Sequence, residues 1–272
     1  MISELDKSEF YKARRLINEQ GQMEAKAVVE GVNPGRIFVD DVQAPTTGMI
    51  WLGNNDGFIF IGDERNERFT NEINDFIDRV IVPEAKLVGL EWFEGVGNHE
   101  RWNKQIEELF KHRKLGNWNQ KVYTLKKEDY SKEHEPRIDL EYSVLKMSKE
   151  LTNGTYQTQF MESKILEFWS SLENFFNEGI GYCAVYKNEI VSVCFSGFVV
   201  ENVHCVDIET LEEHQGKKLA QKIAHAFVSD CLERGMLPYW DCMEGNKPSV
   251  AVAVKIGFKN VFNYVGYEFP FN

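Results

Sequence analysis

The chain has 272 residues and a formal net charge of −12, from 31 Lys and Arg against 43 Asp and Glu. Its residues are 43% hydrophobic and 27% charged, which is typical of a globular protein with a core of its own. The negative charge argues against a nucleic-acid partner and against attachment to anionic lipid. The charged N-terminus lacks the apolar core of a secretory signal, and no stretch approaches the roughly 18 apolar residues that span a bilayer. We therefore expect a cytoplasmic protein without a membrane partner.

The cysteines also point to a reducing compartment. All five lie after residue 180, their number is odd, and no two form a C-x-x-C pair. This pattern argues against a disulfide framework and against a zinc site, so we expect no metal. The five residues are Cys183, Cys194, Cys205, Cys231 and Cys242.

The N-terminal part reads as helices followed by a β-meander. Loose helical spacing over residues 3–30, broken by Gly21, predicts two short helices. Three runs rich in β-branched and aromatic residues follow, and turn residues that include Asn54-Asn55-Asp56-Gly57 join them into antiparallel strands. The predicted strands are 36–40, 48–52 and 57–61.

The pattern then returns to helices. We expect Thr70 to cap a helix that ends at Pro83, a short strand over 86–93, and a second helix that carries Trp102 and Phe110 on its apolar face. The first part of the chain is therefore an α/β domain in its own right.

The charged segment 126–137, which has Pro136 near its end, is the predicted linker. It divides the chain into the predicted domains 1–131 and 132–272. Beyond it, an apolar face over 163–177 predicts one helix that Gly179 ends. Three strands follow, over 181–186, 189–200 and 204–209, and a Lys187-Asn188 turn joins the first two. The predicted fold is α/β (α+β) with a mixed, mostly antiparallel sheet, and the similar order of elements in the two halves suggests a diverged duplication.

The stretch from Val206 to Ala220 runs from a strand through a loop into a helix that ends near Gly235. A helix N-terminus offers unpaired N–H groups and the positive end of the helix dipole, which together suit a phosphate. Gly216 leaves room for close approach, and Lys217 and Lys218 add positive charge. The alternative interpretation is an ordinary loop with solvated lysines.

The next elements strengthen the phosphate interpretation. A strand over 236–242 is followed by Asn246, which leads into a helix that ends at Gly257-Phe258. This order, with Gln215-x-x-x-x-Ala220 before it, resembles the GNAT superfamily of acyl-CoA-dependent acyltransferases. Together with Ser249 and the preceding Thr210, it also looks like the branch of zwittermicin-resistance-type acetyltransferases, which carry an N-terminal extension.

The resemblance implies a GNAT-like sheet flanked by helices, acetyl-CoA as co-substrate, and direct acetyl transfer to the amine of a small molecule in a ternary complex. A monomer or a homodimer is expected. The loop over 214–220 would surround the pyrophosphate, while Asn246 and Ser249 would lie near the pantetheine arm or the adenosine end. The implied cofactor-binding residues are Thr210, His214, Gln215, Gly216, Lys217, Lys218, Leu219, Ala220, Asn246 and Ser249.

Two positions depart from the family pattern. Lys218 stands where the family usually has a second glycine, and Ala253 stands where many members carry the tyrosine that protonates the leaving thiolate. A thiolate near a helix N-terminus can also leave with the help of water. The tyrosines that could take the role of the acid, or simply pack in the core, are Tyr239, Tyr264 and Tyr267.

Attack by an amine also requires a base near the end of the central strand. The candidates, in order, are Glu209, Asp207 and His204, with Glu201 as a fourth. Strand alternation places His204 on one face and the two carboxylates on the other. The alternative roles are a carboxylate that orients the loop and a histidine satisfied inside the sheet. Cys242 is expected to be an apolar filler and not a nucleophile.

Two other function classes remain open from the sequence. The first is a catalytically silent acyl-CoA-binding or regulatory module, which would bind the cofactor without turnover. The second is an α/β module for a different phosphate-bearing ligand, which would have no affinity for coenzyme A.

Overall fold

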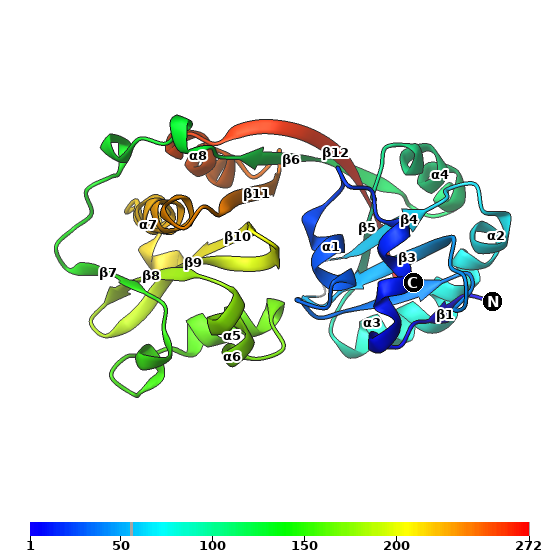
Figure 1. Ribbon diagram of the computed structural model, residues 1–272, viewed down its shortest axis with the longest axis horizontal. Helices are drawn as coiled ribbons and strands as arrows, with labels where there is room; N and C mark the ends of the chain where they lie inside the picture. Colours follow the sequence, from blue (N-terminus) through cyan, green and yellow to red (C-terminus); the bar gives the residue numbers. More distant parts are fainter. Residues whose placement is uncertain (55–56, 272) are drawn as a thin grey trace. The chain divides into compact units, whose positions relative to one another are not determined.

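The computed structural model describes residues 1–54 and 57–271 (Figure 1). The chain forms two compact units, of which the first contains residues 1–120 and the C-terminal segment from Tyr264, and the second is Lys121–Asn263. The boundary predicted at 131/132 therefore falls inside the second unit. Of the predicted turn at residues 54–57, Asn55 and Asp56 lie outside the described residues.

Unit 1 has the predicted meander and the two short helices before it, the first of them a 3-10 helix. Strands β2, β3 and β4 pair antiparallel, and β5 pairs parallel to β4. The elements are β1 (Ser3–Glu4), η1 (Lys7–Leu16), α1 (Met23–Val29), β2 (Gly35–Val39), β3 (Thr47–Leu52), β4 (Phe58–Gly62), α2 (Glu67–Phe76), η2 (Ile77–Ile81), α3 (Val82–Leu87), β5 (Trp92–Gly97) and α4 (Arg101–Phe110).

The core of unit 1 lies between its strands and the helices α2 to α4. Phe93 of β5 stacks between Phe58 of β4 and Phe269, with ring centroids 4.6 Å apart on either side. Phe269 belongs to β12 (Lys259–Pro270), whose second half pairs antiparallel with β5. The C-terminal strand is thus fixed in unit 1 by aromatic packing as well as by its backbone ladder.

The predictions between residues 66 and 97 need correction. Asn66, and not Thr70, caps α2, because its side chain accepts a hydrogen bond from the Phe69 amide. Pro83 does not end the helical segment: it lies in the first turn of α3, where its missing N–H is not needed, and a π-helical turn joins α2 to α3. The chain stays helical to Leu87, so β5 begins at Trp92 and the strand predicted over 86–93 is wrong.

Asn66→Ala should lower the free energy of unfolding by at least about 1 kcal/mol, because it removes the cap and the side-chain hydrogen bonds to Asp40 and Thr46. Thr70→Ala should change it by less than about 0.5 kcal/mol, since Thr70 lies inside the helix. Urea denaturation of both variants tests the assignment, and equal losses would contradict it.

Unit 2 contains the remaining elements, and β6 and β12 each have residues in both units. Strands β7 to β10 pair antiparallel and β11 pairs parallel to β10, in the order β12-β6-β11-β10-β9-β8-β7. The elements are β6 (Gly116–Thr124), η3 (Lys127–Asp129), η4 (Lys132–His134), β7 (Tyr142–Lys146), η5 (Lys149–Thr152), α5 (Gln159–Phe168), α6 (Leu172–Glu178), β8 (Gly181–Tyr186), β9 (Glu189–Val200), β10 (Val203–Thr210), η6 (Glu212–His214), α7 (Leu219–Glu233), β11 (Leu237–Met243) and α8 (Lys247–Ile256).

The two faces of the sheet in unit 2 carry different helices. Helix α7 buries Ile223, Phe227 and Val228 against one face, while α5 and α6 lie on the other face (Figure 1). The three predicted strands, the turn with positive φ at Lys187 and Asn188, and the two C-terminal helices are all confirmed.

The helix predicted over 163–177 is instead two helices. Trp169, between α5 and α6, is 2% exposed, and its indole N–H donates to the Ser196 carbonyl of β9 at 2.8 Å. This hydrogen bond anchors the connection between the two helices to the sheet. Ser171 then caps α6 by accepting from the Asn174 amide at 3.1 Å. Because both helices turn apolar residues inward, the combined sequence pattern looked like a single face.

The predicted linker is a segment that lies along α7. It contains two 3-10 turns, and Lys222 of α7 forms an ion pair with Glu135 at 2.8 Å. Tyr130 packs against the core cluster of unit 2 and its hydroxyl donates to the His225 carbonyl. The charged composition of 126–137 therefore reflects one exposed side of a packed segment.

The two units share one connectivity. In each, three antiparallel strands lead into a helical segment, a strand that pairs parallel with the third, and a further helix. A strand and helices also precede the three strands in both units. This repeated order is what a duplication predicts.

Candidate active site

The central feature of unit 2 is a gap between two neighbouring strands. The parallel ladder of β10 and β11 runs from Val203–Leu237 to Cys205–Tyr239 and ends there. Strand β10 nevertheless continues to Thr210 and β11 to Met243. Beyond Cys205 and Tyr239 the two strands no longer pair with each other, which leaves a gap between their facing edges.

The corresponding strands of unit 1 stay together. The ladder of β4 and β5 extends to Phe60–Gly97, and the Asn98 amide then donates to the Phe60 carbonyl at 2.9 Å. Nε2 of His99 lies 3.0 Å from the Gly62 carbonyl oxygen, which ties the ends of the two strands to each other. Asp63, Glu64 and Arg65 follow β4, whereas the loop after β10 carries Glu212, Glu213, Lys217 and Lys218.

The loop after β10 is shaped to admit an anion. Gly216 has a φ of +75°, and a Cβ added there would meet nothing within 4 Å. Lys218 also adopts the left-handed region, with a φ of 64°, and its exposed side chain does not cap α7. The first hydrogen bond of α7 runs from the Lys222 amide to the Lys218 carbonyl, so the amides before it lie at the open N-terminus. The lysine at the usual glycine position is therefore tolerated by pointing to solvent.

Side chains hold this loop in place. Gln215 Nε2 donates to the Thr210 carbonyl at 3.1 Å, and the Thr210 hydroxyl lies 2.6 Å from that of Ser192. His214 Nδ1 is 2.9 Å from the hydroxyl of Tyr142 in β7. Lys217 Nζ donates to the Glu213 carbonyl at 2.7 Å. The predicted cofactor residues Thr210, Gln215 and His214 thus fix the conformation of the loop.

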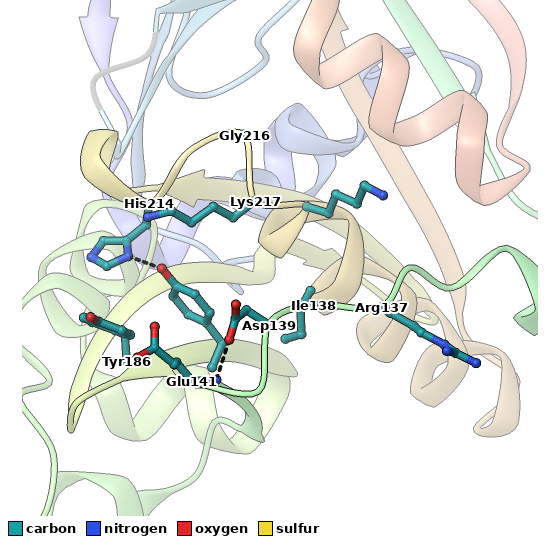
Figure 2. Close-up of a pocket in the computed structure, with 10 residues that line it drawn as sticks. Arg137, Ile138, Asp139, Glu141, Tyr186, His214, Gly216 and Lys217 are labelled. Atoms are coloured by element: carbon teal, nitrogen blue, oxygen red, sulfur yellow. Dashed lines mark hydrogen bonds between the residues drawn. The ribbon is translucent and has the colours of Figure 1, made fainter.

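A pocket of about 460 Å³ opens beside this loop (Figure 2). It lies within unit 2, between the loop and the segment that leads into β7. Its lining combines aromatic rings with charges of both signs: Arg137, Ile138, Asp139, Glu141, Tyr142, Tyr186, His214, Gly216, Lys217 and Lys218.

The other predicted cofactor residues flank the gap. Leu219 is buried in the core at the start of α7, and Ala220 follows it in the first turn. Across the gap, the Asn246 side chain caps α8 by accepting from the Ser249 amide at 3.2 Å. The Ser249 hydroxyl accepts from the Trp240 indole of β11 at 2.9 Å. The two sets of residues therefore belong to the helix that follows each of the separated strands.

The two candidate carboxylates share one face of β10. Asp207 pairs with Phe195 of β9 and its Cβ lies beside Gly197, while Glu209 reaches α5, where its Oε2 is 2.7 Å from Lys164 Nζ. Lys164 also contacts Glu167 at 3.0 Å. Burial lowers the pKa of Lys164, but the two carboxylates outweigh it and raise the pKa overall. Glu209 is half exposed, so a second ligand can reach it.

His204 and Glu201 lie elsewhere. His204 faces α7, is 1% exposed, and its Nδ1 is 2.8 Å from the Ser196 hydroxyl. Glu201 is in the turn before β10, at the opposite end of the strand from Thr210. The structure thus brings Asp207 and Glu209 together and leaves the other two candidate bases away from them.

Cys242, Tyr239 and Tyr267 are buried, whereas Tyr264 is half-buried. Burial raises the pKa of the Cys242 thiol, which disfavours a thiolate nucleophile. Tyr267 belongs to the core of unit 1, and its hydroxyl donates to Glu107 at 3.0 Å. Tyr264 also belongs to unit 1, whereas Tyr239 is the last paired residue of β11, at the closed end of the gap.

Sequence reasoning missed three residues of this region. Lys164 lies on a helix that the pattern did describe, but its ion pair with Glu209 joins positions far apart in the chain. Tyr142 and Arg137 belong to the segment interpreted as a linker and its continuation. The apolar Ile138 and Tyr142 at the end of that charged stretch were the available signal that it packs against something.

Two other kinds of site have no counterpart in the described part of the chain. No group of three or more His, Cys, Asp or Glu side chains there is arranged to hold a metal ion. Within the same residues, no helix has the length and apolar character needed to cross a bilayer.

His204 should make the fold acid-sensitive. Burial lowers its pKa from 6.5 to about 4, and nearby Arg234 acts in the same direction while Asp230 opposes it. The unfolded chain binds the proton first as the pH falls, so stability present above pH 6.5 is lost on the way to pH 4, by about 3 kcal/mol. His204→Asn should lose correspondingly less over this range in urea titrations. Equal losses in both proteins would contradict this origin.

Comparison with known proteins gives consistent matches over the whole chain. The family model "GNAT acetyltransferase" matches residues 14–267. "Uncharacterized N-acetyltransferase YdfB" of Bacillus subtilis (strain 168) is 26% identical over 242 residues, which are 89% of this chain and 88% of that protein.

Solved structures share the fold. A GCN5-related N-acetyltransferase-like protein from Streptococcus suis 89/1591 matches with a TM-score of 0.69 and 19% identity, over 96% of this chain and 98% of that chain. A tandem GNAT protein from the clavulanic acid biosynthesis pathway matches with a TM-score of 0.61 and 10% identity, over 100% and 99% of the two chains. The tandem neighbour fits the duplication seen in the connectivity, while the zwittermicin-resistance branch stays a prediction. The predicted superfamily is confirmed: the chain belongs to the GNAT acetyltransferase family.

Proposed function

We propose that this protein is an N-acetyltransferase that transfers the acetyl group of acetyl-CoA to the amine of a small molecule, by direct transfer in a ternary complex. The observation that carries the proposal is the gap between β10 and β11, which opens next to the glycine-containing loop at the N-terminus of α7. Family membership supports the same chemistry. Cytoplasmic location and a monomeric or homodimeric state belong to this proposal as well.

The residues around the gap fit acetyl-CoA. Gly216 leaves open space in front of the α7 N-terminus, where backbone N–H groups would hold the pyrophosphate. The separated edges of β10 and β11 would pair with the amide groups of the pantetheine arm, as an added strand pairs with a sheet edge. Asn246 and Ser249 would border that arm from α8.

Glu209 is the proposed base, with Asp207 behind it on the same face. During transfer the amine nitrogen bonds to the acetyl carbon, the carbon–sulfur bond breaks, and the proton of the amine passes to Glu209 directly or through water. The ion pair with Lys164 holds Glu209 in position on the side of α5. We assign no proton transfer to His204, because it is buried on the other face.

No tyrosine stands at position 253, where Ala253 is fully buried. The leaving thiolate would take its proton from water, and the positive end of α7 would stabilise its charge. Tyr239 is the one tyrosine of the three candidates that lies at the gap.

Gly216→Glu should weaken acetyl-CoA binding at least tenfold, equivalent to about 1.4 kcal/mol, because it places a carboxylate where the pyrophosphate is expected. Gly235→Glu is the matched control: Gly235 follows the other end of α7, with a similar φ of +73° and open space around it. Calorimetric titration of both variants with acetyl-CoA distinguishes a loss of binding caused by the carboxylate at position 216 from one caused by strain in the backbone. An unchanged dissociation constant for Gly216→Glu would remove this loop from the binding site.

Glu209→Gln should lower kcat by about 100-fold with less than a twofold change in acetyl-CoA affinity, because a general base typically contributes at least that factor. The deficit should shrink at high pH, where more of the amine is already deprotonated. Glu167→Gln breaks the other ion pair of Lys164 and should leave kcat within a few-fold. Thiol release with a panel of small primary amines measures these rates, and a deficit that stays constant with pH would argue against a base at position 209.

The buried alanine at position 253 favours one alternative function, a catalytically silent acyl-CoA-binding or regulatory module. That module would bind acetyl-CoA but release no thiol with any amine of the panel. A module for another phosphate-bearing ligand would not bind acetyl-CoA at all.

A further inference from the structure

A cluster of aromatic rings lies between α5 and the sheet of unit 2, beside the two candidate carboxylates of β10. Phe168, the last residue of α5, packs edge to face on Phe195 and Phe198 of β9, with ring centroids 5.7 and 5.5 Å apart. Phe195 and Phe198 are buried, whereas Phe168 is half-buried. Phe168 therefore keeps part of an apolar ring in reach of a ligand.

Gly197 lets this ring approach the strand. It is the extra residue of a β-bulge in β9, since β10 pairs with the residues on either side of it. A Cβ added at Gly197 would lie 3.1 Å from the Phe168 ring and 3.4 Å from the Cβ of Asp207. Even an alanine would press on the ring, so the glycine allows Phe168 to lie next to Asp207.

Helix α5 follows β10 in matching steps. Lys164 contacts Glu209, and Phe168, one helical turn further along α5, lies beside Asp207. Residues i and i+4 share one face of a helix, and residues i and i+2 share one face of a strand. The ring of Phe168 is thus displaced from Glu209 by two strand residues, which is about 7 Å.

The ring has a fixed orientation before a ligand arrives. Two edge-to-face contacts hold its plane, and the next residue, Trp169, is anchored to the Ser196 carbonyl at 2.8 Å. Binding therefore orders no flexible side chain at this position, which lowers the entropic cost of the contact. A fixed apolar surface beside carboxylates can discriminate among amines by their apolar part.

We propose that the acceptor is a primary amine with an apolar ring or branched chain, which packs on Phe168 while the nitrogen faces Glu209. This inference rests on the proposed function and names the substrate class of the same site. The ammonium form of such an amine is attracted by Asp207 and Glu209, and its apolar end is stabilised by leaving water. A spacer of about three carbons between nitrogen and apolar group covers most of the 7 Å or so between the two contacts.

The test measures kcat/KM on the full chain by thiol release, with acetyl-CoA at saturation. The two acceptors compared are 3-phenylpropylamine and n-propylamine, which differ by the ring. The wild-type protein should prefer 3-phenylpropylamine by about tenfold, because its ring contacts Phe168. Benzylamine should gain less than about threefold over n-propylamine, because its ring lies too close to the nitrogen to reach Phe168.

Phe168→Ala should remove the preference, with kcat/KM for 3-phenylpropylamine falling about tenfold, to near that of n-propylamine. The ratio between two acceptors does not depend on how much of the variant is folded. Leu166→Ala is the matched control: Leu166 is 49% exposed on the same helix, but two residues from Phe168 and so on another face. Its ratio should equal that of the wild type.

Equal kcat/KM of the wild-type protein for 3-phenylpropylamine and n-propylamine would overturn this inference. So would a benzylamine gain as large as that of 3-phenylpropylamine, or a preference that persists in Phe168→Ala. Each of these results leaves the proposed function standing, because thiol is released. If no amine releases thiol, the proposed function falls and the inference falls with it.

Discussion

The site of this protein depends on the point at which two parallel strands stop pairing. Cys205 and Tyr239 form the last pair of β10 and β11, and beyond them the two strands continue without pairing to each other. Unpaired peptide groups are costly when they are buried away from water, so the separation persists only where water or a ligand satisfies them. Glu209 of β10 contacts Lys164 of α5, and Trp240 of β11 donates to Ser249 of α8. Each of the separated strands is thus anchored to a different helix.

The loop at the end of β10 carries a second constraint, since the chain must turn sharply to begin α7 with its amides exposed. Two residues in the left-handed region achieve this, and one of them is Lys218. A side chain in that region costs on the order of 1 kcal/mol, which the surrounding hydrogen bonds of Gln215 and His214 offset. A lysine at this position also adds a cation to the lining of the pocket, where its charge favours an anionic ligand.

Local signals predicted most of the fold and several of the residues that flank the gap. Strands β2 to β4 and β8 to β11 and helices α4, α7 and α8 follow from periodicity and caps. The alternation of β10 placed His204 apart from Asp207 and Glu209, as the structure does. The errors arose where one local pattern is compatible with two structures. A proline such as Pro83 can follow the end of a helix or lie in its first turn, and the packing of the apolar residues after it determines which of the two forms. The partners Lys164 and Tyr142 are set by tertiary contacts, which one sequence does not contain.

The two units share one connectivity, but we propose a ligand site only in unit 2. Both units have a strand that could separate from its parallel neighbour, but in unit 1 the Asn98 amide extends the ladder and His99 reaches the Gly62 carbonyl. The loop that follows β4 begins with Asp63 and Glu64, both of which lie near Arg65. The two units thus differ in whether the ends of their parallel strands are tied together. The same connectivity is compatible with both arrangements.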